Sequence, residues 1–127
     1  YFNLGEIYMF DKEFHKALDC YRKGLDIDTR FNNRINLAGD YNMLGELYME
    51  MDRLRDAETA FGKAVIYSQE IKSQVELADA YYNLGILSKK LNLRRKFMEY
   101  MRLAQEIYWN TDRVKYAQIK DELTNTP

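Results

Sequence analysis

The sequence has few of the residues that break helices. Its 127 residues contain one proline, the final residue Pro127, and six glycines. A proline inside a helix removes a backbone hydrogen bond and clashes with the preceding turn. Because the interior of the chain has none, long helices are permitted throughout.

Other absences exclude several classes of protein. Cys20 is the only cysteine, so the chain has neither a disulfide framework nor a cysteine metal site. A net charge of −1 argues against general affinity for nucleic acid, which needs many cations to neutralise phosphates. No apolar run approaches the roughly 20 residues that span a bilayer, and the first residues lack the pattern of a signal peptide. We expect no membrane partner, and a cytoplasmic location by default.

Residues for catalysis are also scarce. His15 is the only histidine, and its place on a helix surface predicts an exposed side chain. Glu46 and Glu50 share a helix face at i, i+4, but without a nearby histidine or cysteine they do not indicate a metal site. No glycine-rich phosphate loop is present. We therefore expect no enzyme activity, no catalytic residue, no cofactor and no metal, and a structural role for Cys20.

An eight-residue pattern occurs three times, at residues 1–8, 41–48 and 81–88. Its glycines, Gly5, Gly45 and Gly85, are 40 residues apart. A fixed period of this size is typical of proteins built from stacked structural repeats. The apolar residues between the glycines recur with helical spacing on one face, so each unit is predicted to be a pair of amphipathic helices.

The predicted organisation is a single domain over residues 1–127. It comprises repeat 1 at 1–30, repeat 2 at 31–70, repeat 3 at 71–109 and a capping helix at 110–124. Asn92 is predicted to cap the second helix of repeat 3, and Asn110 or Thr111 to cap the last helix. A terminal helix of this kind would cover the last apolar face of the stack. The chain begins without Met and inside the repeated pattern, so we expect it to be a piece of a longer protein.

These residues resemble the tetratricopeptide repeat, whose signature is W-x2-L-G-x2-Y followed by A-x3-F. The signature positions are occupied here by Leu4, Gly5, Tyr8, Ala17, Leu44, Gly45, Tyr48, Ala57, Leu84 and Gly85. The resemblance implies an all-α, right-handed α-solenoid of three helix hairpins plus a capping helix. The period of 40 exceeds the usual 34, and is similar to the long repeats of Pins/LGN-type scaffolds, kinesin light chains and MalT-like or Rap-like regulators.

The glycines have a physical reason of their own. Glycine inside a helix costs about 0.5–1 kcal/mol relative to alanine, so three glycines in one register predict close approach of a partner helix. Ala17 and Ala57 are expected to be the small residues that face them. The third repeat departs from the pattern, with Ser88 at the second tyrosine and Phe97 at the small alanine. We expect its hairpin to open or shift.

The resemblance also implies a binding site, because the first helix of each tetratricopeptide hairpin lines a concave groove. The predicted groove residues are Phe2, Glu6, Met9, Asn42, Glu46, Met49, Asp79, Tyr82, Ile86 and Lys89. Asparagine can satisfy both a donor and an acceptor of a peptide backbone, and methionine and aromatic side chains give adaptable contact area. Phe2, Tyr82 and Ile86 have no evident role in the core. The alternative is that these are merely solvated helix faces.

The charges restrict the ligand. The carboxylate clamp of chaperone-binding repeats needs Lys and Asn at positions held here by Phe2, Glu6 and Asp79, so an acidic chaperone-type tail is excluded and a basic or neutral segment fits better. The basic run at residues 89–96 could bind an acidic partner near a helix start. We interpret it instead as a solvated turn, in which Lys89 and Lys90 complement a helix C-terminus.

The resulting hypothesis is a scaffold that binds a peptide or helical segment of a partner protein. Two alternatives stay open. One is a ligand- or peptide-sensing regulatory domain of a longer regulator. The other is a self-association module, in which a homo-oligomer forms through the apolar N-terminal face of Tyr1, Leu4 and Ile7.

Overall fold

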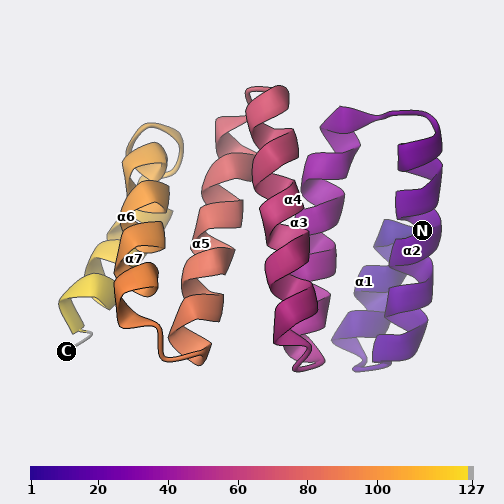
Figure 1. Cartoon of the computed structure of the whole chain (residues 1–127), viewed down its shortest axis with the longest axis horizontal. Helices are drawn as coiled ribbons and strands as arrows, with labels where there is room; N and C mark the ends of the chain where they lie inside the picture. Colours follow the sequence, from indigo (N-terminus) through magenta and orange to yellow (C-terminus); the bar gives the residue numbers. More distant parts are fainter. Residues whose placement is uncertain (126–127) are drawn as a thin grey trace.

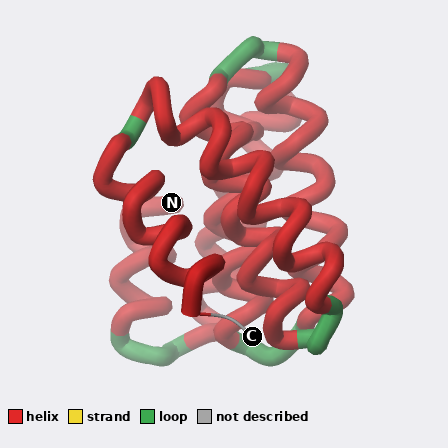
Figure 2. The backbone as a smooth tube through the Cα atoms, turned by 90° about the vertical axis from the view of Figure 1, so that its left-hand side faces the viewer, coloured by secondary structure: helices red, strands yellow, loops and turns green. Residues whose placement is uncertain are grey.

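The computed structural model describes residues 1–125, and this part of the chain consists of helices joined by short turns, without a strand (Figure 2). The helices are α1 (Phe2–Phe10), α2 (Phe14–Arg30), α3 (Arg34–Glu50), α4 (Leu54–Glu70), α5 (Gln74–Lys90), α6 (Arg94–Thr111) and α7 (Arg113–Asn125). The all-α prediction is confirmed. No helix within residues 1–125 is both long and apolar enough to cross a membrane.

The repeat is built from two equivalent halves. Helices α2, α3, α4 and α5 each have 17 residues and are joined by turns of three residues. In every one of these turns, and in those after α1 and α5, the middle residue has a positive φ, between 51° and 61°. These residues are 20 apart along the chain: Lys12, Asn32, Asp52, Lys72 and Asn92. The period of 40 residues therefore consists of two units of 20 residues, each a helix with its turn. The residues beyond the usual 34 make the helices of the repeat longer.

Each of these turns ends its helix with the same pair of backbone hydrogen bonds. At the end of α1, Lys12 N donates to Met9 O over 2.9 Å and Glu13 N donates to Tyr8 O over 2.8 Å. Asp52 and Arg53 donate in the same way after α3. This is the Schellman motif, which satisfies the last carbonyls of a helix by placing one residue in the left-handed conformation. It ends the helices here without a glycine or a proline.

The helices form two layers of a stack (Figure 1). The hairpins are α1 with α2, α3 with α4, and α5 with α6, and α7 packs against α6. In Figure 1 the stack runs from α1 and α2 at one end to α6 and α7 at the other, with α1 behind α2. Helices α3 and α5 contact each other directly. The first helices of the hairpins therefore share one face, as a helical-repeat solenoid requires.

The three glycines lie where the two helices of each hairpin approach closely. A Cβ at Gly5 would lie 2.4 Å from the ring of Tyr21, and one at Gly45 would lie 2.4 Å from the ring of Phe61. At Gly85 the nearest atom would be a Met101 side-chain carbon, at 2.9 Å. The predicted close approach is therefore confirmed.

The side-chain atoms nearest to a Cβ at Gly5 and Gly45 belong to rings, Tyr21 and Phe61, and not to the predicted alanines. Ala17 lies against Gly5 through its carbonyl oxygen, at 3.3 Å, and Ala57 supplies none of the three atoms nearest to Gly45. The ring contacts are possible because a flat ring can lie directly over a position that has no Cβ.

The third hairpin does not open around Phe97. This side chain is buried with Met101, Ala104 and Tyr108 of its own helix and Ala78 of α5. Ser88, which replaces the second tyrosine of the motif, is also buried, and its hydroxyl donates to Leu84 O over 2.8 Å. In the third repeat, the larger side chain of Phe97 in place of alanine thus occurs together with the smaller side chain of Ser88 in place of tyrosine.

Two predicted helix caps are wrong. Asn92 is the left-handed residue of the α5–α6 turn, so it terminates one helix rather than capping the next. Helix α6 includes Asn110 and Thr111, and Asp112 caps α7 instead, with Oδ1 accepting from Lys115 N over 3.1 Å. The capping role of α7 follows from Ile119, which is buried against α6.

Candidate functional site: the groove of the first helices

A hollow of about 500 Å³ lies between α1, the start of α2 and α3. Its lining combines apolar side chains with three carboxylates and one ammonium: Glu6, Met9, Phe10, Lys12, Phe14, Glu46, Met49 and Glu50. Four of the predicted groove residues, Glu6, Met9, Glu46 and Met49, are among them. Phe10 is the most exposed of the large hydrophobic residues within residues 1–125, with 88% of its surface accessible.

A second, smaller hollow of about 210 Å³ lies further along the stack, and most of its lining residues have polar groups. Helices α3, α5, α6 and α7 supply its lining: Glu46, Asp79, Tyr82, Asn83, Tyr108, Lys115 and Gln118. Glu46 lines both hollows, and we call the two hollows together the groove. The structure thus brings together six predicted residues, Glu6, Met9, Glu46, Met49, Asp79 and Tyr82.

Glu46 is held at the centre of the groove by the next repeat. The amide of Asn83 donates from Nδ2 to Glu46 Oε1 over 3.3 Å. Desolvation raises the pKa of Glu46, and the nearby carboxylates of Asp79 and Glu6 raise it further, while the bond from Asn83 lowers it. The net shift is upward because a crowded, partly desolvated carboxylate is less stable in its charged form.

Asp79 is the acceptor for two groups in the smaller hollow. The Tyr108 hydroxyl donates to Asp79 Oδ1 over 2.5 Å, and Lys115 Nζ lies 3.3 Å from the same oxygen. Burial raises the pKa of Tyr108 well above its usual range, and the hydrogen bond to Asp79 raises it further. Tyr108 therefore stays a neutral donor, and Lys115 of α7 supplies the cation that pairs with this carboxylate.

Asn42 does not lie in the groove as predicted. Its side chain is only 5% exposed, and its amide donates to Glu76 on α5, at 3.2 Å to the backbone oxygen and 3.3 Å to Oε2. The donors that were expected to meet a peptide backbone therefore link two repeats of the chain itself.

The interpretation that Phe2, Tyr82 and Ile86 lack a role in the core is also wrong. Phe2 stacks on Tyr21 with ring centroids 5.1 Å apart, and it covers Gly24, where a Cβ would lie 2.5 Å from its ring. Tyr82 and Ile86 pack against the buried cluster around Ala78 and Ile119. Tyr82 also lines the smaller hollow, so its side chain contacts the buried cluster and the groove.

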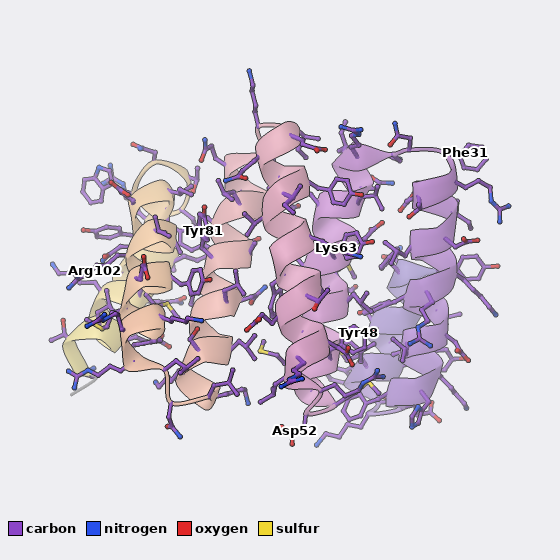
Figure 3. The ribbon with its side chains drawn as sticks, in the orientation of Figure 1. Phe31, Tyr48, Asp52, Lys63, Tyr81 and Arg102 are labelled. Carbon is purple, nitrogen blue, oxygen red and sulfur yellow. The ribbon has the colours of Figure 1, made fainter. Side chains whose placement is uncertain are left out.

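The remaining predicted groove residue, Lys89, lies at the hairpin tip, with Nζ 5.5 Å from the centre of the Phe97 ring. Lys89 and Lys90 are in the last turn of α5, as the helix-dipole interpretation of the basic run requires. Arg94 and Arg95 line a shallow hollow of about 840 Å³ on α6, which also includes Arg102 at the end of the stack (Figure 3). Its cations are interspersed with Glu99 and Glu106.

Six residues of the groove were missed by sequence reasoning. Asn83, Tyr108, Lys115 and Gln118 line the smaller hollow, and Lys12 and Phe14 line the larger one. The latter two come from the turn after α1 and the start of α2, whereas the resemblance directed attention to the first helices only. The 20-residue spacing of the turns could have indicated that the turn after α1 lies beside the groove. Within residues 1–125, no group of three or more candidate ligands could hold a metal ion.

Comparison with known proteins agrees with this geometry. Family models described as tetratricopeptide repeat match residues 1–65 and residues 78–110. No curated protein matches the chain. The first match covers just over half of the 127 residues, and the helix hairpins with their close-approach glycines are what the motif requires. The chain belongs to the tetratricopeptide repeat family.

Proposed function

We propose that this chain is a protein-interaction module that binds a peptide or helical segment of a partner protein in the groove. Tetratricopeptide repeats are generally protein-interaction modules, which supports a binding role rather than a catalytic one. The position of the site within the fold and the form of its ligand are the new parts of the proposal.

The observation that carries the proposal is the exposure of Phe10 inside a hollow. A phenylalanine that is 88% exposed is poorly explained by its own fold, because burying it would be favourable. It stands beside Met9 and Met49, whose flexible thioethers adapt to varied surfaces. Carboxylates surround these apolar groups. An amphipathic segment lying in the groove would satisfy both kinds of side chain.

The test is a selection of random twelve-residue peptides displayed on phage, with the chain immobilised. Selected peptides would be synthesised and their affinities measured by fluorescence polarisation for the parent and for Phe10→Ser. The matched control is Phe31→Ser, because Phe31 is also exposed but lies at the α2–α3 turn, away from the groove (Figure 3). We expect Phe10→Ser to weaken binding at least tenfold and Phe31→Ser to change it less than twofold. Equal affinities for all three proteins would contradict the proposal.

Self-association is a second candidate, favoured by the outer face of α1. Tyr1, Leu4 and Ile7 are all exposed there. In the later repeats the counterparts of Leu4 and Ile7 are buried: Leu44, Leu47, Leu84 and Leu87. Light scattering tests self-association by measuring the molar mass at protein concentrations from about 5 to 200 µM, roughly the range in which weak dimers form. A mass that rises with concentration and stays monomeric in Leu4→Ser/Ile7→Ser supports this candidate, and a constant monomer mass removes it.

A further inference from the structure

The charges of the groove are not balanced by the chain itself. Its lining includes four carboxylates, from Glu6, Glu46, Glu50 and Asp79, but only two ammonium groups, from Lys12 and Lys115. Among residues 1–125, the single ion pair within this lining joins Lys115 to Asp79. The side chains of Glu6 and Glu50 have no hydrogen bond or ion pair with any other described residue. Net negative charge therefore remains around the larger hollow.

The repeats show why the imbalance is at this end. Glu46 receives the amide of Asn83 from the following repeat. Glu6 is the equivalent of Glu46 one repeat earlier, and the residue 40 positions before Asn83 is Met43, which has no amide to offer. Lys115 reaches Asp79 from α7, at the other end of the groove. The partners that the chain provides thus reach Glu46 and Asp79, and none of them reaches Glu6 or Glu50.

The carboxylates also act on one another across the groove. Asp79 from α5 and Glu6 from α1 both make the charged form of Glu46 less favourable, whereas Asn83 and Lys115 make it more favourable. A cation placed between α1 and α3 would relieve this repulsion. The same place lies against the apolar side chains of Met9, Phe10 and Met49.

We propose that the ligand of the groove is a basic amphipathic segment. One lysine or arginine of the ligand lies among the carboxylates of Glu6, Glu46 and Glu50. An apolar side chain within one helical turn of it lies on Met9, Phe10 and Met49. This inference rests on the proposed function, and it adds the chemistry of the partner to the location of the site.

Two physical consequences distinguish this ligand from a neutral one. Its affinity depends on salt, because ions screen attraction between partly exposed charges over about 8–10 Å at physiological ionic strength. Its affinity also depends on the formal charge of the groove, independently of the shape of the hollow. Glutamine in place of glutamate preserves shape and, at position 46, an oxygen that can accept from Asn83.

The experiment uses the peptides selected on the whole chain and compares three proteins. The test variant is Glu6→Gln/Glu46→Gln/Glu50→Gln, which removes three charges with little change in volume. The control is Asp19→Asn/Asp26→Asn/Glu58→Gln, which removes three charges from exposed positions of α2 and α4 outside the groove. Circular dichroism and thermal melts establish that all three are folded. Affinity is measured at 50 and 300 mM NaCl.

We expect the selected peptides to carry lysine or arginine within four residues of a leucine, methionine or aromatic residue. The test variant should bind them at least tenfold more weakly at 50 mM NaCl, and the control within threefold of the parent. Neutral or acidic peptides that lose affinity in Phe10→Ser but not in the glutamine variant would overturn this inference and leave the proposed function standing. Peptides that respond to neither substitution would overturn both.

Discussion

The amide of Asn42 on α3 donates to the backbone oxygen of Glu76 on α5 over 3.2 Å, and so joins two consecutive repeats. Its second contact, to Glu76 Oε2 at 3.3 Å, lies over Gly39, where a Cβ would be 3.5 Å from Glu76 Oε1. A Cβ at position 39 would only be in ordinary van der Waals contact with the glutamate, so the contact does not require a glycine there. This contact is part of the interface between repeats, not part of a ligand site.

Asn42→Ala should therefore lower stability without altering the groove. Removing a buried hydrogen-bond donor that leaves its acceptors unpaired costs about 1–3 kcal/mol. Urea denaturation measures this loss, and Asn3→Ala, at an exposed asparagine of α1, should stay within about 0.5 kcal/mol of the parent. If Asn42→Ala instead retains full stability and loses peptide affinity, Asn42 belongs to the binding site after all.

Phe97 should carry the packing that tyrosine carries in the other repeats. A cation lies over the ring at each hairpin tip: Lys16 over Tyr8 at 5.6 Å, Arg53 over Tyr48 at 4.9 Å and Lys89 over Phe97 at 5.5 Å. Tyr48 lies near the tip marked by Asp52 in Figure 3. Ser88 stands at the tyrosine position of the third repeat, so we infer that Phe97 replaces the missing ring from the opposite helix.

Phe97→Ala should destabilise the chain by about 3–5 kcal/mol, because it leaves a cavity in a buried cluster. Adding Ser88→Tyr to this variant should recover at least about 1 kcal/mol, whereas Ser88→Tyr alone should destabilise by overpacking. Urea denaturation of the four proteins gives the coupling between the two positions. Additive effects would show that the two departures from the motif are unrelated.

Lys72→Asn should stabilise the chain. Lys72 has φ 57° in the turn between α4 and α5, and a left-handed conformation costs an ordinary side chain about 1–2 kcal/mol, while asparagine tolerates it better. We expect a gain of about 0.5–1 kcal/mol by chemical denaturation. Asn32→Lys makes the reverse change in an equivalent turn and should be destabilising. Equal stability of both variants and the parent would remove backbone strain as the explanation.

Stability should fall as pH rises because of Asp40. Its side chain is only 7% exposed, and burial, a hydrogen bond with Asp28 and the charges of Asp28 and Glu76 raise its pKa to about 8. The unfolded value is about 3.9, so between these two values the folded chain binds more protons than the unfolded chain. The stabilising contribution is therefore complete below about pH 4 and is lost as pH rises through about 8.

Asp40→Asn removes this titration while keeping an amide donor near Asp28. The melting temperature of the variant relative to the parent should rise between pH 5.5 and pH 9, since only the parent must then hold a charged carboxylate in the α2–α3 interface. Differential scanning calorimetry at both pH values measures the difference. A gap that is the same at pH 5.5 and pH 9 would contradict the raised pKa.

The repeats, and the helices that line the groove, could be predicted from the sequence because they depend on local periodicity. The glycine of the motif, Gly45 in the second repeat, marks a close approach of helices in each repeat. Glu46 lies about 100° further round the helix by helical geometry alone. The turns could not be predicted from composition, since Lys12 and Lys72 are poor candidates for a left-handed residue. The role of Asn42 depends on a residue 34 positions away, so no local pattern distinguishes it from a ligand contact.

The most direct test of the groove is ¹H–¹⁵N chemical-shift mapping of the chain with a selected peptide. We expect the largest shifts in the segments that line the groove, at residues 6–14, 46–50 and 79–83, and small shifts along the exposed face of α4. Phe10→Ser should abolish these shifts at the same peptide concentration, and Phe31→Ser should preserve them. Shifts concentrated on α6 around Arg102, and unchanged by Phe10→Ser, would place the binding surface elsewhere and contradict binding in the groove.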